Sequence, residues 1–273
     1  MEAAAGTTSP EYRWLQRAAR VLGSLFLIAI LLYAGAQVYL RIEARRTAYF
    51  LKALSSIQIG QPAASVKGFV TTYERQVYRV EGPGEITYFV EADPLPLRAL
   101  RPDWLAADVS DFLLRTGDWR RNSGLRFWRA VGTLRVKADL VEYTWASLAV
   151  EGENEWLMGN WDYRDSFSPD FVRVRGIPVT GNLESRSYFA NWAHLHMGSE
   201  TGEVFENHLT SAATAEQLSA ARDFNLACLR SRKGCRSLCE LMPSAAAYGR
   251  RHNSLSLGWN SGSWGQQTDE SCH

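Results

Sequence analysis

The chain has little cysteine, little net charge and none of the common catalytic signatures. Its formal net charge of +1 gives no overall field that would attract nucleic acid. The serine-hydrolase G-x-S-x-G, zinc-protease H-E-x-x-H, Walker A and dinucleotide glycine patterns do not occur, so no motif selects an enzyme class. The four cysteines all fall in the last fifth of the chain: Cys228, Cys235, Cys239 and Cys272.

Long apolar runs are also scarce, and the single example is Val21 to Leu40. These twenty residues carry no charge and have the length that an α-helix needs to cross a bilayer. As a signal peptide the segment would be cut after Ala36, behind an A-x-A pattern. We favour an uncleaved anchor, because the helical pattern continues past Ala36 through residues 41–55. The absence of a cysteine just after the apolar run disfavours a lipoprotein.

The orientation of this anchor rests on two opposing signals. The numbers of Lys and Arg on the two sides of the apolar segment are nearly equal, and the small difference weakly favours a C-terminal part on the cytoplasmic side. These residues are Arg13, Arg17 and Arg20 before the segment and Arg41, Arg45, Arg46 and Lys52 after it. An even number of clustered cysteines instead suggests disulfides in an oxidising compartment, so we expect an extracytoplasmic domain. A cytoplasmic domain, the alternative, would keep all four thiols free.

The rest of the chain predicts an α+β domain with an antiparallel sheet packed by two or three helices. A short helix should follow Pro62, a hairpin should turn at residues 81–85, and strands should dominate residues 125–208. Helices are expected from Asp103 and from Ser211 or Thr214. The expected order is a cytoplasmic tail at 1–20, a transmembrane helix at 21–40, a juxtamembrane helix at 41–56, the extracytoplasmic domain at 57–251 and a flexible tail at 252–273.

The segment beginning IQIG at Ile57 carries a limited resemblance. Its I-x-x-G, small polar, Val pattern resembles small outer-membrane assembly lipoproteins over fewer than twenty residues, although the later Gly-x-Pro of that pattern is not in its place. The layout as a whole is similar to uncharacterised bacterial envelope proteins with one N-terminal anchor, a β-rich middle and a C-terminal helix containing cysteines. Neither resemblance implies a catalytic residue.

One cluster of residues suggests metal chemistry. His194 and His196 are two residues apart and would share a strand face, and a hairpin would bring Glu206 or His208 towards them. Imidazole with carboxylate is a plausible zinc, manganese or iron site, which would make the protein a metal-dependent hydrolase. An ordinary polar strand face is the simpler interpretation, so we expect no cofactor.

The clustered cysteines are expected to form disulfides. Because Cys235 and Cys239 are four residues apart in one helix, they should not bridge each other, and we favour Cys228 with Cys239, leaving Cys235 and Cys272 paired or free. A cysteine metal site with His252 or His273 is disfavoured because the C-x2-C spacing is absent.

Of the ten tryptophans, Trp161 lies among polar residues and is the one expected to be exposed and able to stack on a sugar.

Local charge leaves room for an anionic partner. Residues 151–170 hold six acidic side chains against Arg164, and residues 222–251 hold seven Lys and Arg against two acids. Such runs usually form solvated faces, but a basic surface near an anionic polymer or lipid headgroups is the alternative. The sequence therefore predicts a single-pass envelope protein with a non-catalytic binding or scaffolding domain, whose partner is an envelope protein or an anionic or glycan ligand and not nucleic acid.

Overall fold

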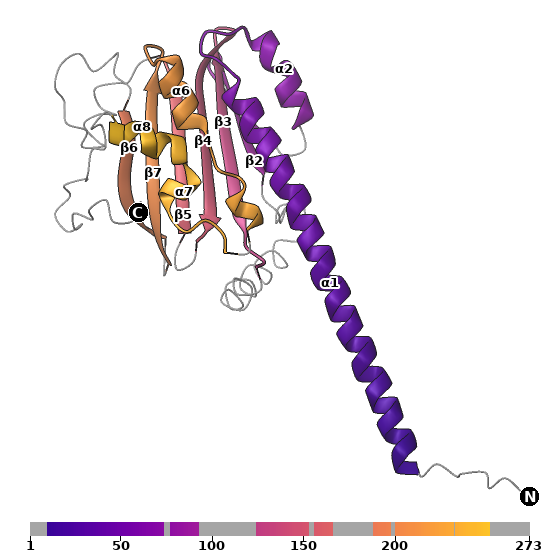
Figure 1. Ribbon diagram of the computed structural model, residues 1–273. Helices are drawn as coiled ribbons and strands as arrows, with labels where there is room; N and C mark the ends of the chain where they lie inside the picture. Colours follow the sequence, from indigo (N-terminus) through magenta and orange to yellow (C-terminus); the bar gives the residue numbers. More distant parts are fainter. Residues whose placement is uncertain are drawn as a thin grey trace, which may run out of the picture. The chain divides into compact units, whose positions relative to one another are not determined.

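The computed structural model describes residues 10–73, 77–92, 124–152, 156–165, 188–197, 200–231 and 233–251 (Figure 1). The chain divides into two compact units, Met1–Ile42 and Glu43–His273. The helix expected from Asp103, the tail at 252–273 and Cys272 lie outside the described residues. For β6, at Tyr188–Met197, the structure describes the path of the backbone.

Helix α1 runs without a break from Pro10 to Ser55, as the continuous pattern predicts. In the first unit its large aliphatic side chains are exposed on all sides, with Leu22 at 66% and Leu32 at 71%. An 18-residue window has a mean hydropathy of 2.1 and no buried residue, so α1 is long and apolar enough to cross a membrane.

The last turns of α1, which cover most of the predicted juxtamembrane segment at 41–56, belong to the second unit. Phe50 and Leu54 are fully buried. A Cβ on Gly132 of strand β3 would lie 2.6 Å from Leu54 Cδ2 and 2.7 Å from Phe50 Cζ, so the absence of a side chain permits this close approach of helix to strand. Trp128, also on β3, donates from Nε1 to Thr47 Oγ1 over 3.0 Å.

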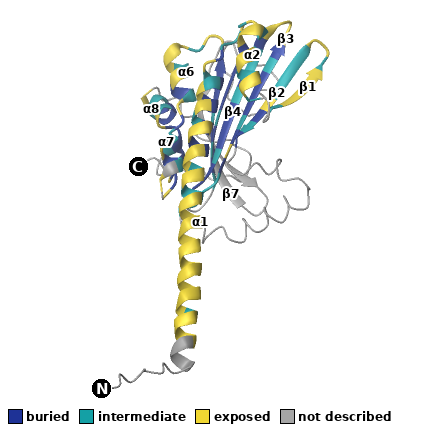
Figure 2. Ribbon diagram, turned by 90° about the vertical axis from the view of Figure 1, so that its right-hand side faces the viewer, coloured by how far each residue is buried: buried dark blue, intermediate teal, exposed yellow. Residues whose placement is uncertain are grey.

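The described strands form a 7-stranded sheet in the order β1-β2-β3-β4-β5-β7-β6. Their bounds are Val77–Gly82 for β1, Glu85–Ala92 for β2, Trp128–Lys137 for β3, Leu140–Glu151 for β4, Trp156–Arg164 for β5, Tyr188–Met197 for β6 and Glu200–Thr210 for β7. Strands β3 and β4 are mostly buried, whereas the edge strand β1 is largely exposed (Figure 2).

The prediction of an antiparallel sheet is wrong for one pair of strands, since β5 and β7 run parallel. The α+β class is confirmed, but the sheet is mixed. Strand β6 takes the outer edge and its antiparallel partner β7 lies inside, so β7 runs in the direction of β5. Hydrophobic periodicity identifies strands but does not identify their neighbours, which is why the parallel pair was missed.

The helices of the second unit include α2 at Ala63–Thr72, α6 at Ala215–Arg222, α7 at Leu238–Leu241 and α8 at Pro243–Arg251. Helices α6, α7 and α8 lie on the same face of the sheet as the end of α1 (Figure 1). Gly159 of β5 approaches Met242 and Phe224 there, as Gly132 approaches α1. A capping box between Thr214 and Gln217 begins α6, which selects Thr214 over Ser211 as the N-cap.

The structure joins Cys228 to Cys235, so the favoured pairing of Cys228 with Cys239 is wrong. Helix α6 ends at Arg222, earlier than predicted, and Cys228 instead begins a short 3-10 turn, η3, at Cys228–Arg230. Gly234 then adopts a φ of +70°, which turns the chain back and brings the Cys228 and Cys235 Cα atoms within 4.8 Å. Cys239 is also disulfide-bonded.

Candidate functional site

The predicted hairpin between β6 and β7 forms, but its register separates the predicted metal ligands. His194 pairs with Glu203, whereas His208 pairs with Tyr188. Tyr188 and His194 are six positions apart, which corresponds to about 20 Å along the strand. The backbone therefore does not bring His194 or His196 to His208.

The partner of His208 is instead Asp162, on the neighbouring parallel strand. The β5–β7 register aligns these two residues, and His208 Nδ1 lies 2.5 Å from Asp162 Oδ1. Glu206 is two residues before His208 on the same face of β7, and its Oε2 lies 3.4 Å from His208 Nε2. The structure thus brings together Glu206 and His208, two of the candidate ligands, and adds the carboxylate of Asp162, which the sequence did not indicate.

The charge of His208 follows from these two carboxylates. Burial by itself would lower the pKa of the imidazole, but hydrogen bonds to Asp162 and Glu206, together with their charges, raise the pKa to about 9. His208 is therefore protonated at neutral pH, with each ring nitrogen next to a carboxylate. Among the described residues, no group of three or more His, Cys, Asp or Glu is placed to hold a metal ion.

The ionic network continues across the sheet. Arg164 donates to Asp162, and its guanidinium lies 4.8 Å from the centroid of the Tyr143 ring on β4. Arg135 of β3 lies 5.4 Å from the same centroid. Burial, followed by the charge of Asp162, raises the pKa of Tyr143, so its phenol is neutral. Positive and negative groups alternate along β5 and β7, and their charges largely cancel.

Trp161 lies on the opposite face of β5 and is only 1% exposed, so the prediction that it is exposed is wrong. Neighbouring strand residues point to opposite faces, and Trp161 therefore faces the helices while Asp162 faces the ionic network. The Arg222 guanidinium lies 4.9 Å from the Trp161 ring and 4.9 Å from the Tyr163 ring. The polar residues beside Trp161 in the sequence misled the prediction, because they belong to the other face.

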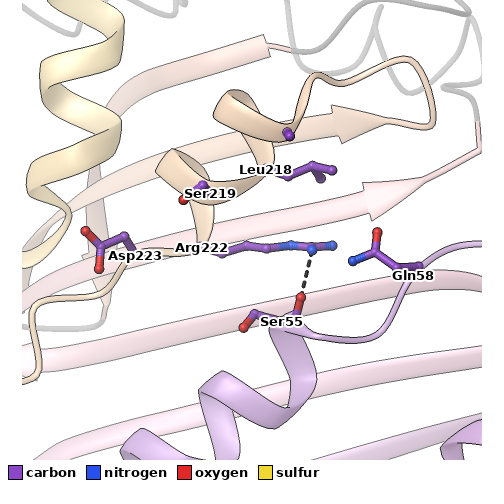
Figure 3. Close-up of a pocket in the computed structure, with 7 residues that line it drawn as sticks. Ser55, Gln58, Leu218, Ser219, Arg222 and Asp223 are labelled. Atoms are coloured by element: carbon purple, nitrogen blue, oxygen red, sulfur yellow. Dashed lines mark hydrogen bonds between the residues drawn. The ribbon is translucent and has the colours of Figure 1, made fainter.

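Arg222 borders an open pocket between the end of α1 and helix α6 (Figure 3). The pocket has a volume of about 430 Å³, within the range typical of small-molecule sites. It is lined by Ser55, Gln58, Ala215, Leu218, Ser219, Arg222 and Asp223. Figure 3 shows the Arg222 side chain extending from α6 so that its guanidinium lies beside Ser55 and faces Gln58.

The Arg222 cation has neutral partners. Its Nη1 donates to the Ser55 carbonyl oxygen over 2.7 Å, one of the last carbonyls of α1. Within the described part of the chain, its Nε and Nη2 are buried and have no hydrogen-bond partner. The adjacent Asp223 points away in Figure 3 and accepts a hydrogen bond from Ser244. Burial lowers the pKa of Arg222 to about 10, which still leaves the guanidinium charged at neutral pH.

Sequence reasoning missed this pocket because it joins Ser55 and Gln58 to residues more than 150 positions later. The only local signal was the basic run that begins at Arg222. Comparisons with known proteins add no functional assignment: no protein-family model, curated protein or solved structure matches the chain.

Proposed function

We propose that this protein is a membrane-tethered envelope protein whose second unit lies outside the cytoplasm and acts as a non-catalytic binding or scaffolding domain. The observation that carries this proposal is the continuous helix α1, whose exposed apolar half leads directly into a disulfide-bonded domain. A helix that is apolar on all sides is suited to lipid and not to water. The Val21–Leu40 segment would then bind the bilayer.

The disulfide supports the extracytoplasmic placement of the domain. The Cys228–Cys235 bridge is the kind of bond that persists in secreted and periplasmic proteins and is rare in the cytosol. The nearly balanced Lys and Arg at the ends of the apolar segment oppose this placement only weakly. We therefore give more weight to the bridge than to the flanking charges.

Binding is better supported than catalysis. The His208 imidazole, the central group of the hydrolase alternative, is protonated and has both nitrogens beside carboxylates. The register holds the backbones of His194 and His196 away from it. By contrast, the Arg222 pocket is open and large enough for a ligand. An envelope protein or an anionic ligand remains the expected partner, whereas glycan stacking on buried Trp161 has lost its support.

Partner capture from native membranes tests the proposed role. The full chain is crosslinked in intact cells, purified, and analysed by mass spectrometry, with each captured protein then used for reciprocal capture. The control fuses residues 1–42 to an inert reporter, which keeps the apolar segment and removes the domain. We expect reciprocal partners that the control does not capture. Identical sets from the two proteins would contradict a binding or scaffolding role for the domain.

A further inference from the structure

We propose that the pocket lined by Arg222, Gln58, Ser219 and Leu218 binds the carboxylate of a small monoanionic ligand that carries a short apolar group. The inference rests on the proposed binding role and adds the chemical class of one ligand. No other property of the domain depends on it.

The first argument is the uncompensated charge of Arg222. Its guanidinium is held between the Ser55 carbonyl and the rings of Trp161 and Tyr163, and all of these partners are neutral. A partly buried cation without a carboxylate beside it is costly, and a bound anion offsets that cost. The site is also rigid, because the same contacts fix the orientation of the guanidinium before any ligand arrives.

The second argument concerns the kind of anion. A guanidinium has a planar fork that matches the two oxygens of a carboxylate. Asp223 lines the same pocket, so its negative charge disfavours a dianion such as phosphate more than a monoanion.

The remaining lining residues suit the rest of such a ligand. Leu218 and Ala215 provide an apolar wall, and Ser219 provides a hydroxyl. In Figure 3 the half-buried Gln58 amide faces the tip of the guanidinium, and no hydrogen bond joins the two groups. A carboxylate bound to this end of the guanidinium would displace the Gln58 amide.

Calorimetric titration of the full chain in lipid nanodiscs tests the ligand class. The probes are N-acetyl-leucine, its neutral amide, a five-residue peptide ending in a leucine carboxylate, and inorganic phosphate. We expect both carboxylates to bind about tenfold or more tightly than the amide and phosphate, a difference of about 1.4 kcal/mol. Tighter binding of the peptide would identify a peptide C-terminus as the source, and equal binding would identify a small free acid.

Two variants connect the binding to the pocket. Arg222→Gln removes the cation, whereas Gln58→Glu leaves Arg222 in place and puts a carboxylate of the protein beside it. Each variant should weaken the binding of both carboxylate probes about tenfold or more. The matched control is Arg251→Gln, because Arg251 is exposed and pairs with Glu216 over 2.9 Å outside the pocket. It should bind as the wild type does.

Three results would overturn the inference. They are equal affinities for N-acetyl-leucine and its amide, no binding of either carboxylate probe, or an equal loss of carboxylate affinity in Arg251→Gln and Gln58→Glu. Should Arg222→Gln fail to fold, Gln58→Glu still decides the question. Failure of this inference is separable from failure of the proposed function, because partner capture can succeed when no carboxylate binds.

Discussion

At the scale of single residues, burial and charge decide what the side chains can do. Asp162 and His208 have side chains that are 3% and 7% exposed, and they satisfy each other across a parallel strand pair. Glu206 is the third member of this group, and its carboxylate lies beside the second ring nitrogen of His208. The arrangement places paired charges inside the domain, and it makes His208 a source of pH-dependent stability.

The raised pKa of His208 has a definite sign. A histidine whose folded pKa of about 9 exceeds its usual 6.5 contributes stability that is fully present below pH 6.5 and is lost as pH rises through 9. We expect the free energy of unfolding to fall by an amount on the order of 3 kcal/mol over that interval. Denaturation measured between pH 6.5 and 9.5 should show this loss in the wild type and much less of it in His208→Gln.

An equal loss in wild type and variant would assign the pH dependence to other groups. If His208→Gln does not fold, NMR titration of carbon-13-labelled histidine in the wild type should still find an imidazole with a pKa well above 6.5. All histidines titrating near 6.5 would contradict the described network.

Sequence reasoning reached part of this residue-scale arrangement. Glu206 and His208 were named as candidate ligands on one strand of a predicted hairpin, but the neighbours expected for them were His194 and His196. Asp162 was missed because its neighbour across the sheet is 46 positions away and belongs to a parallel pair. Arg222 was seen only as the start of a basic run, since nothing local indicates that it lies over two aromatic rings.

At the scale of elements, local chemistry predicted the beginnings and types of several segments. Helix α2, the β1–β2 hairpin and the cap of α6 all follow from turn and capping residues near them. The position of β7 beside β5 and the Cys228–Cys235 pairing depend on how distant segments meet. Pro243 stands at the first position of helix α8, where the ring is tolerated because the missing N–H would have no partner within the helix.

The contact between α1 and β3 can be tested through glycine. In Gly132→Ala the new Cβ would meet Leu54 and Phe50, two fully buried side chains, at 2.6 and 2.7 Å. We expect the free energy of unfolding to fall by about 1–3 kcal/mol, because a packed core accommodates an added carbon poorly. Denaturant unfolding followed by tryptophan fluorescence would measure the change.

The matched control is Gly68→Ala, on helix α2, where a Cβ meets nothing within 4 Å. Alanine favours helix over glycine, so this variant should be neutral or more stable by up to about 1 kcal/mol. A Gly132→Ala protein as stable as Gly68→Ala would show that α1 does not approach β3 so closely.

At the scale of the whole molecule, the two units have surfaces suited to different surroundings. The first unit has an apolar helix surface suited to lipid, and the second has a buried core, an ionic network and a disulfide. Sequence reasoning predicted the apolar segment from its length and lack of charge. The division between the two units falls at Glu43, within the continuous helix α1.

Labelling of single added cysteines tests the central claim most directly. Gln16→Cys and Ser56→Cys place exposed thiols on the two sides of the apolar segment. In right-side-out membrane vesicles, a membrane-impermeant maleimide should label Ser56→Cys at once and Gln16→Cys only after the membrane is permeabilised, because the second unit is proposed to lie outside the cytoplasm. Immediate labelling of Gln16→Cys, with Ser56→Cys protected until permeabilisation, would contradict the account.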